Sequence, residues 1–105
     1  MDEIVFVNDN HVTVQGSCSR EEAAVLHQAL VCRLNELVER KTEQVELDLC
    51  QVDQIDACGC QLLALFLENL RRHGIIPTAC HLGPETAARI SLLGFSDAFS
   101  VLPPL

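Results

Sequence analysis

The residues best suited to chemistry lie in one short segment of the chain, which reads Asp53-Gln54-Ile55-Asp56-Ala57-Cys58-Gly59-Cys60. Two carboxylates three residues apart could serve general acid–base catalysis. Two thiols separated by one residue could react with an oxidant or bind a soft metal ion. The segment therefore offers three kinds of chemistry, and each needs supporting residues elsewhere in the sequence.

Catalysis by the carboxylate pair lacks that support. No nucleophile, histidine partner or glycine-rich phosphate loop accompanies Asp53 and Asp56. Aspartates in turns commonly accept hydrogen bonds from the nearby backbone. We therefore expect both residues to shape a turn or cap a helix, and we expect the chain not to be an enzyme.

The two thiols leave an alternative function open. A thiol at a helix N-terminus can have a lowered pKa, so Cys58 could act as a redox switch. The simpler interpretation is that Cys58 is a small residue in a tight turn, because no Lys, Arg or His lies within nine residues of it. Cys58, Cys60, Cys80 and His81 could form a metal site, but zinc-binding pairs usually have two to four intervening residues. Thiol redox or metal sensing through Cys58 and Cys60 stays an alternative, while we expect no metal and no cofactor.

Six cysteines are many for 105 residues. Cys32, Cys50 and Cys80 each lie in an apolar run, where a free cysteine behaves as a small hydrophobic residue, so we expect them in the core. Cys18 is expected in a loop beside the first helix. We do not expect a disulfide framework, since a disulfide-dense small protein would contain less leucine and more loop. We expect surface or hydrogen-bonded positions for the four histidines, His11, His27, His73 and His81.

The composition excludes several classes of function. The net charge is −8, so the chain lacks the clustered Lys and Arg that phosphate backbones or anionic membranes attract. There is no apolar run of about 20 residues, which a membrane-spanning helix needs. The segment from Met1 to Val7 is acidic and does not resemble a secretory signal, so we expect a cytoplasmic protein. With 49% hydrophobic residues but no Trp or Tyr, residues 1–105 should form a single domain with an aliphatic core.

The first half of the chain predicts a hairpin followed by a long helix. Residues 3–7 and 11–15 favour strands, joined through Asn8-Asp9-Asn10, and Gly16 is expected to end the second strand. Ser19 and Glu22 have the spacing of a capping box, so they should open a helix that runs to about Arg40. Its apolar stripe consists of Ala23, Leu26, Leu30, Leu34, Leu37 and Val38.

The second half predicts two strands that alternate with two helices. Residues 44–50 alternate as a strand does, and a helix follows over about residues 59–72, with Gly74 just after its end. Residues 75–82 favour another strand, in which Pro77 suggests an edge or a strand start. A third helix should begin at Gly83-Pro84-Glu85 and end at Gly94-Phe95, before a tail that contains Phe99, Val101 and Leu102.

The order β-β-α-β-α-β-α-tail predicts an α/β fold with a mixed sheet of four to five strands and helices packed on it. In the helix expected over residues 59–72, one stripe should face the core, formed by Leu62, Leu63, Phe66 and Leu70. The opposite face carries Gln61, Ala64, Leu65, Glu68 and Arg72. Ala64 and Leu65 should therefore contact solvent, and an apolar patch beside the 57–58 turn is a candidate docking face.

The run from Val45 to Leu63, including Ile55-Asp56-Ala57-Cys58-Gly59, resembles the signature of the STAS domain family. The later Gly74, the Gly83-Pro84-Glu85 run and Leu92-Leu93-Gly94-Phe95 resemble the same family. The family includes bacterial anti-sigma factor antagonists, small chemosensory partner proteins and a subunit of a lipid-transport ABC system. The family pattern is a strand, an Asp, a Ser or Thr within the next two positions, a Gly and then a helix, and Asp56 and Gly59 match it. In the antagonists, the hydroxyl residue is phosphorylated by a partner kinase, which breaks their complex.

The resemblance implies a non-catalytic regulatory module that docks on a protein partner through residues 56–65. The partner would be a kinase-type anti-sigma factor or a chemosensory signalling protein, and a homodimer stays open. Ala57 and Cys58 occupy the phosphoacceptor positions without a hydroxyl, so phosphorylation there should not switch binding. The lipid-transport role is an alternative against which Ala57 counts. The partner-binding residues carried over are Asp56, Ala57, Cys58, Gly59, Cys60, Gln61, Ala64 and Leu65.

Overall fold

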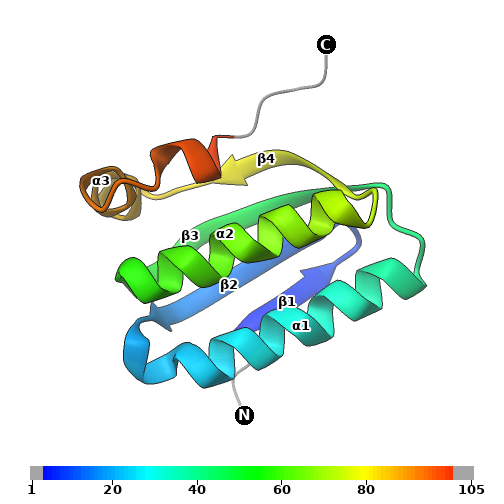
Figure 1. Ribbon diagram of the computed structural model, residues 1–105, viewed down its shortest axis with the longest axis horizontal. Coiled ribbons are helices and arrows are strands. Elements are labelled where there is room, and N and C mark those ends of the chain that lie inside the picture. Colours follow the sequence, from blue (N-terminus) through cyan, green and yellow to red (C-terminus); the bar gives the residue numbers. More distant parts are fainter. Residues whose placement is uncertain (1–3, 101–105) are drawn as a thin grey trace.

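Within residues 4–100, the molecule has one sheet of four strands in the order β1-β2-β3-β4 (Figure 1). The computed structural model of the chain describes residues 4–100. Strand β2 pairs antiparallel with β1 and parallel with β3, which in turn pairs parallel with β4. The sheet is therefore mixed, as predicted, and its strands are β1 (Val5–Asn8), β2 (His11–Cys18), β3 (Gln44–Ile55) and β4 (Ile76–His81).

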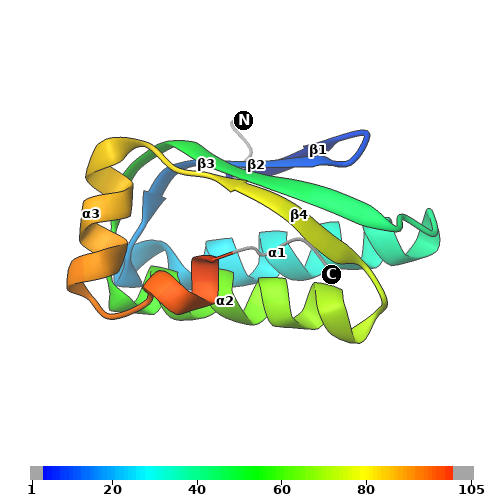
Figure 2. The ribbon, with the colours of Figure 1, turned by 90° about the horizontal axis from the view of Figure 1, so that it is seen from above.

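Two long helices make the crossovers between the parallel strands and cover the same face of the sheet (Figure 2). Helix α1 (Ala23–Glu39) joins β2 to β3, and α2 (Ala57–Arg72) joins β3 to β4. Helix α3 (Pro84–Leu92) lies across one end of the sheet, followed by the short 3₁₀ turn η2 (Ser96–Phe99). The opposite face of the sheet is left without a helix in residues 4–100 (Figure 2).

The core between the sheet and the two helices is aliphatic, as the composition predicts. The predicted leucine stripe of α1 is buried, from Leu26 to Leu37. Strand β3 alternates as predicted and turns every second side chain from Val45 to Leu49 inward. Helix α2 contributes Leu63, Phe66, Leu67 and Leu70. Burial of these large side chains stabilises the fold, because each is removed almost completely from water.

Several predicted boundaries are wrong. Gly16 does not end β2; it has a φ of +84° at an irregularity in the β2–β3 register, and the strand continues to Cys18. Ser19 makes no side-chain capping bond; its Oγ is hydrogen-bonded to Ser17 Oγ at 2.9 Å, and a 3₁₀ turn η1 (Arg20–Glu22) precedes α1. Strand β3 extends five residues past the predicted end, to Ile55, so α2 begins at Ala57.

The burial of the cysteines also differs from prediction. Cys32 and Cys50 are exposed rather than buried, and Cys80 is half-buried against the core. Cys18 is buried at the end of β2 instead of lying in a loop. Apolar neighbours in the sequence do not show whether a cysteine points toward the core or toward solvent.

Other predictions concern single residues. Val38, which is expected in the buried stripe of α1, is 38% exposed. Glu3, Val101 and Leu102 lie outside the described residues.

Pro77 lies inside β4, where the prediction of an edge position is confirmed. An edge strand has one side without ladder partners, so a proline there costs no hydrogen bond in the sheet. The third helix begins at Pro84 and ends before Gly94, which has a φ of +84°. Phe99 of the predicted tail packs into the core from η2.

Candidate functional site

Asp56 fixes the turn between β3 and α2. It is the N-cap of α2, and its Oδ1 accepts a hydrogen bond of 3.0 Å from the backbone N–H of Gly59. Its Oδ2 accepts a second bond of 2.8 Å from the backbone N–H of Arg20, just after β2. One carboxylate thus satisfies a free donor of the helix and ties the start of α2 to the chain that follows β2. The predicted capping role is confirmed.

These hydrogen bonds also set the charge of the turn. The bond from Gly59, followed by that from Arg20, outweighs partial burial and lowers the pKa of the Asp56 carboxyl below its ordinary value. The positive end of the α2 backbone dipole lies at the same place. Asp56 is therefore ionised at neutral pH, and its negative charge stabilises the beginning of the helix.

Gly59 allows α2 to lie directly against the end of β2. A Cβ atom built on Gly59 would overlap the backbone carbonyl oxygen of Cys18, so no other residue fits without a shift of the backbone. The close approach also brings the N–H of Asp56 to 3.3 Å from the same Cys18 oxygen. The match of Gly59 to the family pattern therefore has a steric cause in this chain.

The two thiols of the turn have different surroundings. Cys60 is fully buried, and burial, with a smaller contribution from the charge of Asp56, raises its pKa to about 11. Cys18 lies nearby on β2, and burial raises its pKa to about 12. Both therefore remain thiols at neutral pH and cannot act as nucleophiles. Cys58 is half-buried, so it is the one cysteine of the pair that a solvent-borne molecule can reach.

A metal centre finds no support in this region. In residues 4–100, no three His, Cys, Asp or Glu side chains are grouped so that they could hold a metal ion. The sequence places Cys58 close to Cys60, but Cys60 faces the core. Asp53 lies within β3, where it is exposed and lines a hollow with Asp56, so the prediction of a turn or cap role is wrong for this residue.

Leu65 lies on the outward side of α2 and is 45% exposed. On one side of it, a shallow groove of about 520 Å³ separates α2 from η2, lined by Gln61, Ala64, Leu65, Glu68, Arg71, Phe95 and Ala98. On its other side, a smaller depression runs between α2 and α1, where Val31 is 42% exposed. The predicted outward face of α2 is therefore present, and apolar side chains border it on both sides.

The hollow that Asp53 and Asp56 line lies beside the turn, at the ends of β2 and β3. Its volume is about 350 Å³, and its lining consists of Ser19, Asp53, Gln54, Ile55, Asp56, Glu85, Thr86 and Arg89. Sequence reasoning did not place Ser19 and the α3 residues next to Asp56. Local patterns carry no signal for this contact, because it arises from the position of α3 across the end of the sheet (Figure 2).

The predicted partner-binding residues divide by exposure. Ala57, Gln61 and Leu65 are exposed, while Asp56, Cys58 and Ala64 are half-buried. Gly59 and Cys60 are buried, so their side of the helix holds the turn in place and is not offered to solvent. The surface that a partner could contact is therefore narrower than the segment 56–65.

Comparison with known proteins adds three findings. A family model described as STAS domain matches residues 24–104. A solved structure described as "Crystal Structure Analysis of Mglu" is similar, with 26% sequence identity and a TM-score of 0.51. The similarity covers 77% of this chain but 19% of that chain, so this chain spans about a fifth of that protein's length. No curated protein matches the chain.

No helix in residues 4–100 is long and apolar enough to cross a membrane.

Proposed function

This chain belongs to the STAS domain family, and we propose that it is a non-catalytic binding module that docks on a protein partner through the outward side of residues 56–65. STAS domains are generally non-catalytic regulatory or signalling modules and typically mediate protein–protein interaction. The proposed partner is a cytoplasmic signalling protein of the kinase-type anti-sigma or chemosensory class. Residues 1–105 would act as one domain.

The observation that carries the proposal is the exposure of Leu65 above the groove between α2 and η2. Leu65 is 45% exposed and is bordered by Ala64, Phe95 and Ala98. A partner that covers this apolar surface removes it from water, which favours binding. Gln61, on the same side of α2, offers an amide that can donate and accept hydrogen bonds. The surface lies directly beyond a turn that Asp56 holds by two hydrogen bonds, so the partner meets a preformed shape.

The residues of the turn support the proposal that phosphorylation does not control partner binding. A phosphate adds about −1.5 to −2 charges and can separate an interface. Ala57 is exposed and Cys58 half-buried at the two positions where such a group would sit, and neither carries a hydroxyl. We propose that the chain stays competent to bind whatever the activity of the partner kinase.

Affinity capture with four purified baits tests the docking surface: the wild-type chain, Leu65→Asp, Cys58→Glu and Val38→Asp. Val38 is also an exposed apolar residue, but it lies near the C-terminus of α1, so it is the matched control. We expect the protein captured by the wild type and by Val38→Asp to be lost with Leu65→Asp and with Cys58→Glu. Capture of the same protein by both site variants would remove the proposed surface.

A further inference from the structure

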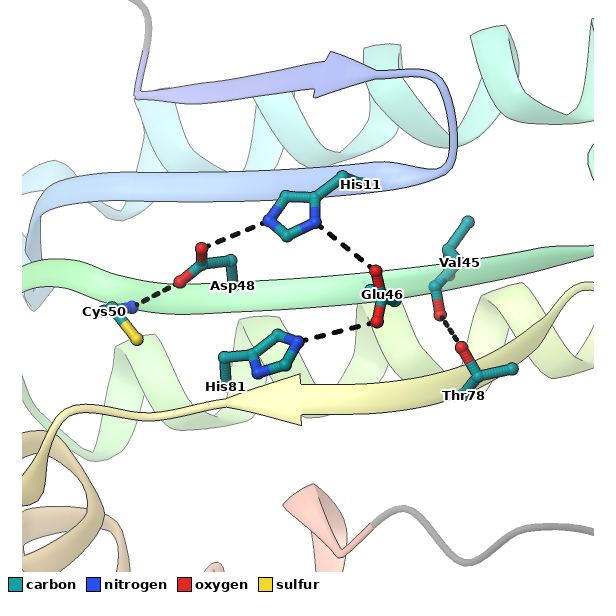
Figure 3. Close-up of polar contacts among 7 residues, drawn as sticks. All are labelled: His11, Val45, Glu46, Asp48, Cys50, Thr78 and His81. Atoms are coloured by element: carbon teal, nitrogen blue, oxygen red, sulfur yellow. Dashed lines mark hydrogen bonds and ion pairs between the residues drawn. The ribbon is translucent and has the colours of Figure 1, made fainter.

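The face of the sheet that no helix covers carries a four-membered polar cluster, drawn in Figure 3. Strand β2 contributes His11, β3 contributes Glu46 and Asp48, and β4 contributes His81 (Figure 3). The inward-facing residues of β3 alternate with this pair of acids, which therefore point away from α1 and α2. Neither the docking surface nor the turn at Asp56 includes any of the four residues.

The strand register places His11 beside both carboxylates and His81 beside Glu46. His11 is directly opposite Glu46, and its Nδ1 lies 3.6 Å from Glu46 Oε2. Its other ring nitrogen, Nε2, lies 3.1 Å from Asp48 Oδ2. His81 is directly opposite Asp48, and its Nε2 lies 3.6 Å from Glu46 Oε1. Glu46 thus has one histidine at each of its oxygens, as Figure 3 shows.

The number of protons on the histidines decides how many of these contacts are attractive. A neutral imidazole has a single N–H, so His11 can donate to Asp48 or to Glu46 but not to both. With a second proton, both ring nitrogens donate, and the contacts become ion pairs. The two carboxylates give the cluster a charge of −2 with neutral histidines, and protonation of both histidines neutralises it.

The hydrogen bonds of Asp48 keep this carboxyl ionised beside the histidines. Burial alone would raise the pKa of the Asp48 carboxyl, but hydrogen bonds from the Cys50 backbone N–H and from His11 outweigh it and lower that pKa. The Cys50 thiol, held by the Asp48 carboxylate, has a raised pKa and stays neutral. Strand β1 (Val5–Asn8) contains no titratable side chain. The two imidazole rings, with centroids 6.1 Å apart, would repel when both are charged, but Glu46 is paired with each of them.

We propose that His11, Glu46, Asp48 and His81 form a proton-operated clamp that ties β2 and β4 to β3 more strongly in mildly acidic than in mildly basic solution. Histidine is the side chain whose charge normally changes in this range. The stabilisation is present where both imidazoles are protonated and is lost as the pH rises and they become neutral. The strand most affected is β4, which is an edge strand of the sheet formed by residues 4–100.

Thermal unfolding at about pH 5.5 and at about pH 8 tests the clamp on the double variant His11→Gln/His81→Gln. The wild type should gain stability on acidification in any case, because a chain of net charge −8 repels itself less. The informative quantity is therefore the difference in unfolding temperature between wild type and variant. We expect this difference to be larger by about 4 °C at the lower pH.

The control is His27→Gln, which removes an exposed histidine of α1 outside the cluster and should give the same small difference at both pH values. A second variant, Glu46→Gln, should lose the larger part of the acid-dependent gain, because Glu46 contacts both histidines while only the His11–Asp48 pair remains. A difference between wild type and the double variant that does not change with pH would overturn the proposal.

Amide hydrogen exchange in the wild-type chain gives a measurement that does not depend on a variant folding. After correction for the intrinsic pH dependence of exchange, the amides of Ala79 to His81 should be protected more strongly at about pH 5.5 than at about pH 8, relative to those of α1. Equal relative protection at the two pH values would also contradict the clamp.

Discussion

Residues 56–65 have an inner and an outer side with different roles, although the residues of the two sides alternate along the sequence. The inner side consists of Asp56, Gly59 and Cys60, which hydrogen-bond or pack against the end of β2. The outer side, with Ala57 and Leu65, is exposed to solvent. A residue can therefore match a family pattern because it sets the shape of the turn, and not because it contacts a partner.

This division makes a general prediction about substitutions. Changes on the inner side should lower the free energy of unfolding, and they weaken binding only because the turn is lost. Changes on the outer side should leave stability unchanged and affect binding directly. Each of the following variants tests one side of that comparison.

The largest effect is expected for Gly59→Ala. The new Cβ would overlap the Cys18 carbonyl oxygen, which belongs to a backbone that cannot move without disturbing β2, so the free energy of unfolding should fall by about 3 kcal/mol. Urea unfolding followed by circular dichroism measures it. Gly83→Ala is the matched control, because a Cβ there meets nothing closer than 4.0 Å. Equal stability of the two variants would refute the steric role of Gly59.

A smaller effect is expected for Asp56→Ala, which removes the acceptor of two backbone hydrogen bonds. At neutral pH, the free energy of unfolding should fall by about 1.5 kcal/mol. Because the pKa of Asp56 is lowered in the folded state, its contribution is complete above the ordinary aspartate pKa and is lost as the pH falls through the lowered value. Denaturant titrations of both proteins should therefore converge below about pH 4. A gap that persisted into strong acid would argue against the ionised cap.

The smallest effect on stability is expected for Leu65→Ala, within about 0.5 kcal/mol of the wild type, since Leu65 is 45% exposed. The same substitution at Leu63, two residues earlier and fully buried, should cost about 3 kcal/mol and provides the contrast. Chemical unfolding of the two variants under identical conditions measures both values. A large loss for Leu65→Ala would mean that this residue belongs to the core and not to a docking surface.

The fold could be predicted largely from the sequence because its signals are periodic. The leucine stripe of α1 and the alternation in β3 survive in the structure, and they determine the order of elements. Boundaries failed where the backbone departs from the regular pattern. Gly16 was predicted to end β2, yet its positive φ accommodates an irregularity inside the strand.

The candidate site could be predicted only along its own segment. The capping role of Asp56 and the exposure of Leu65 follow from local spacing, and both are found. The steric role of Gly59 depends on Cys18, and the hollow beside Asp56 depends on Arg89, which are far away in the sequence. The sequence likewise does not show that His11 and His81 lie together across β3, because this proximity follows from the strand register and not from local spacing.

The most direct test of the docking surface uses cysteines that the chain already has. Cys58 lies in the proposed surface, while Cys32 on α1 and Cys50 on β3 are exposed outside it and act as internal controls. Alkylation followed by mass spectrometry would compare the free chain with its complex with the captured partner. We predict that the partner slows alkylation of Cys58 and leaves Cys32 and Cys50 unchanged. Equal labelling of Cys58 in the free chain and in the complex would contradict docking through the outward side of residues 56–65.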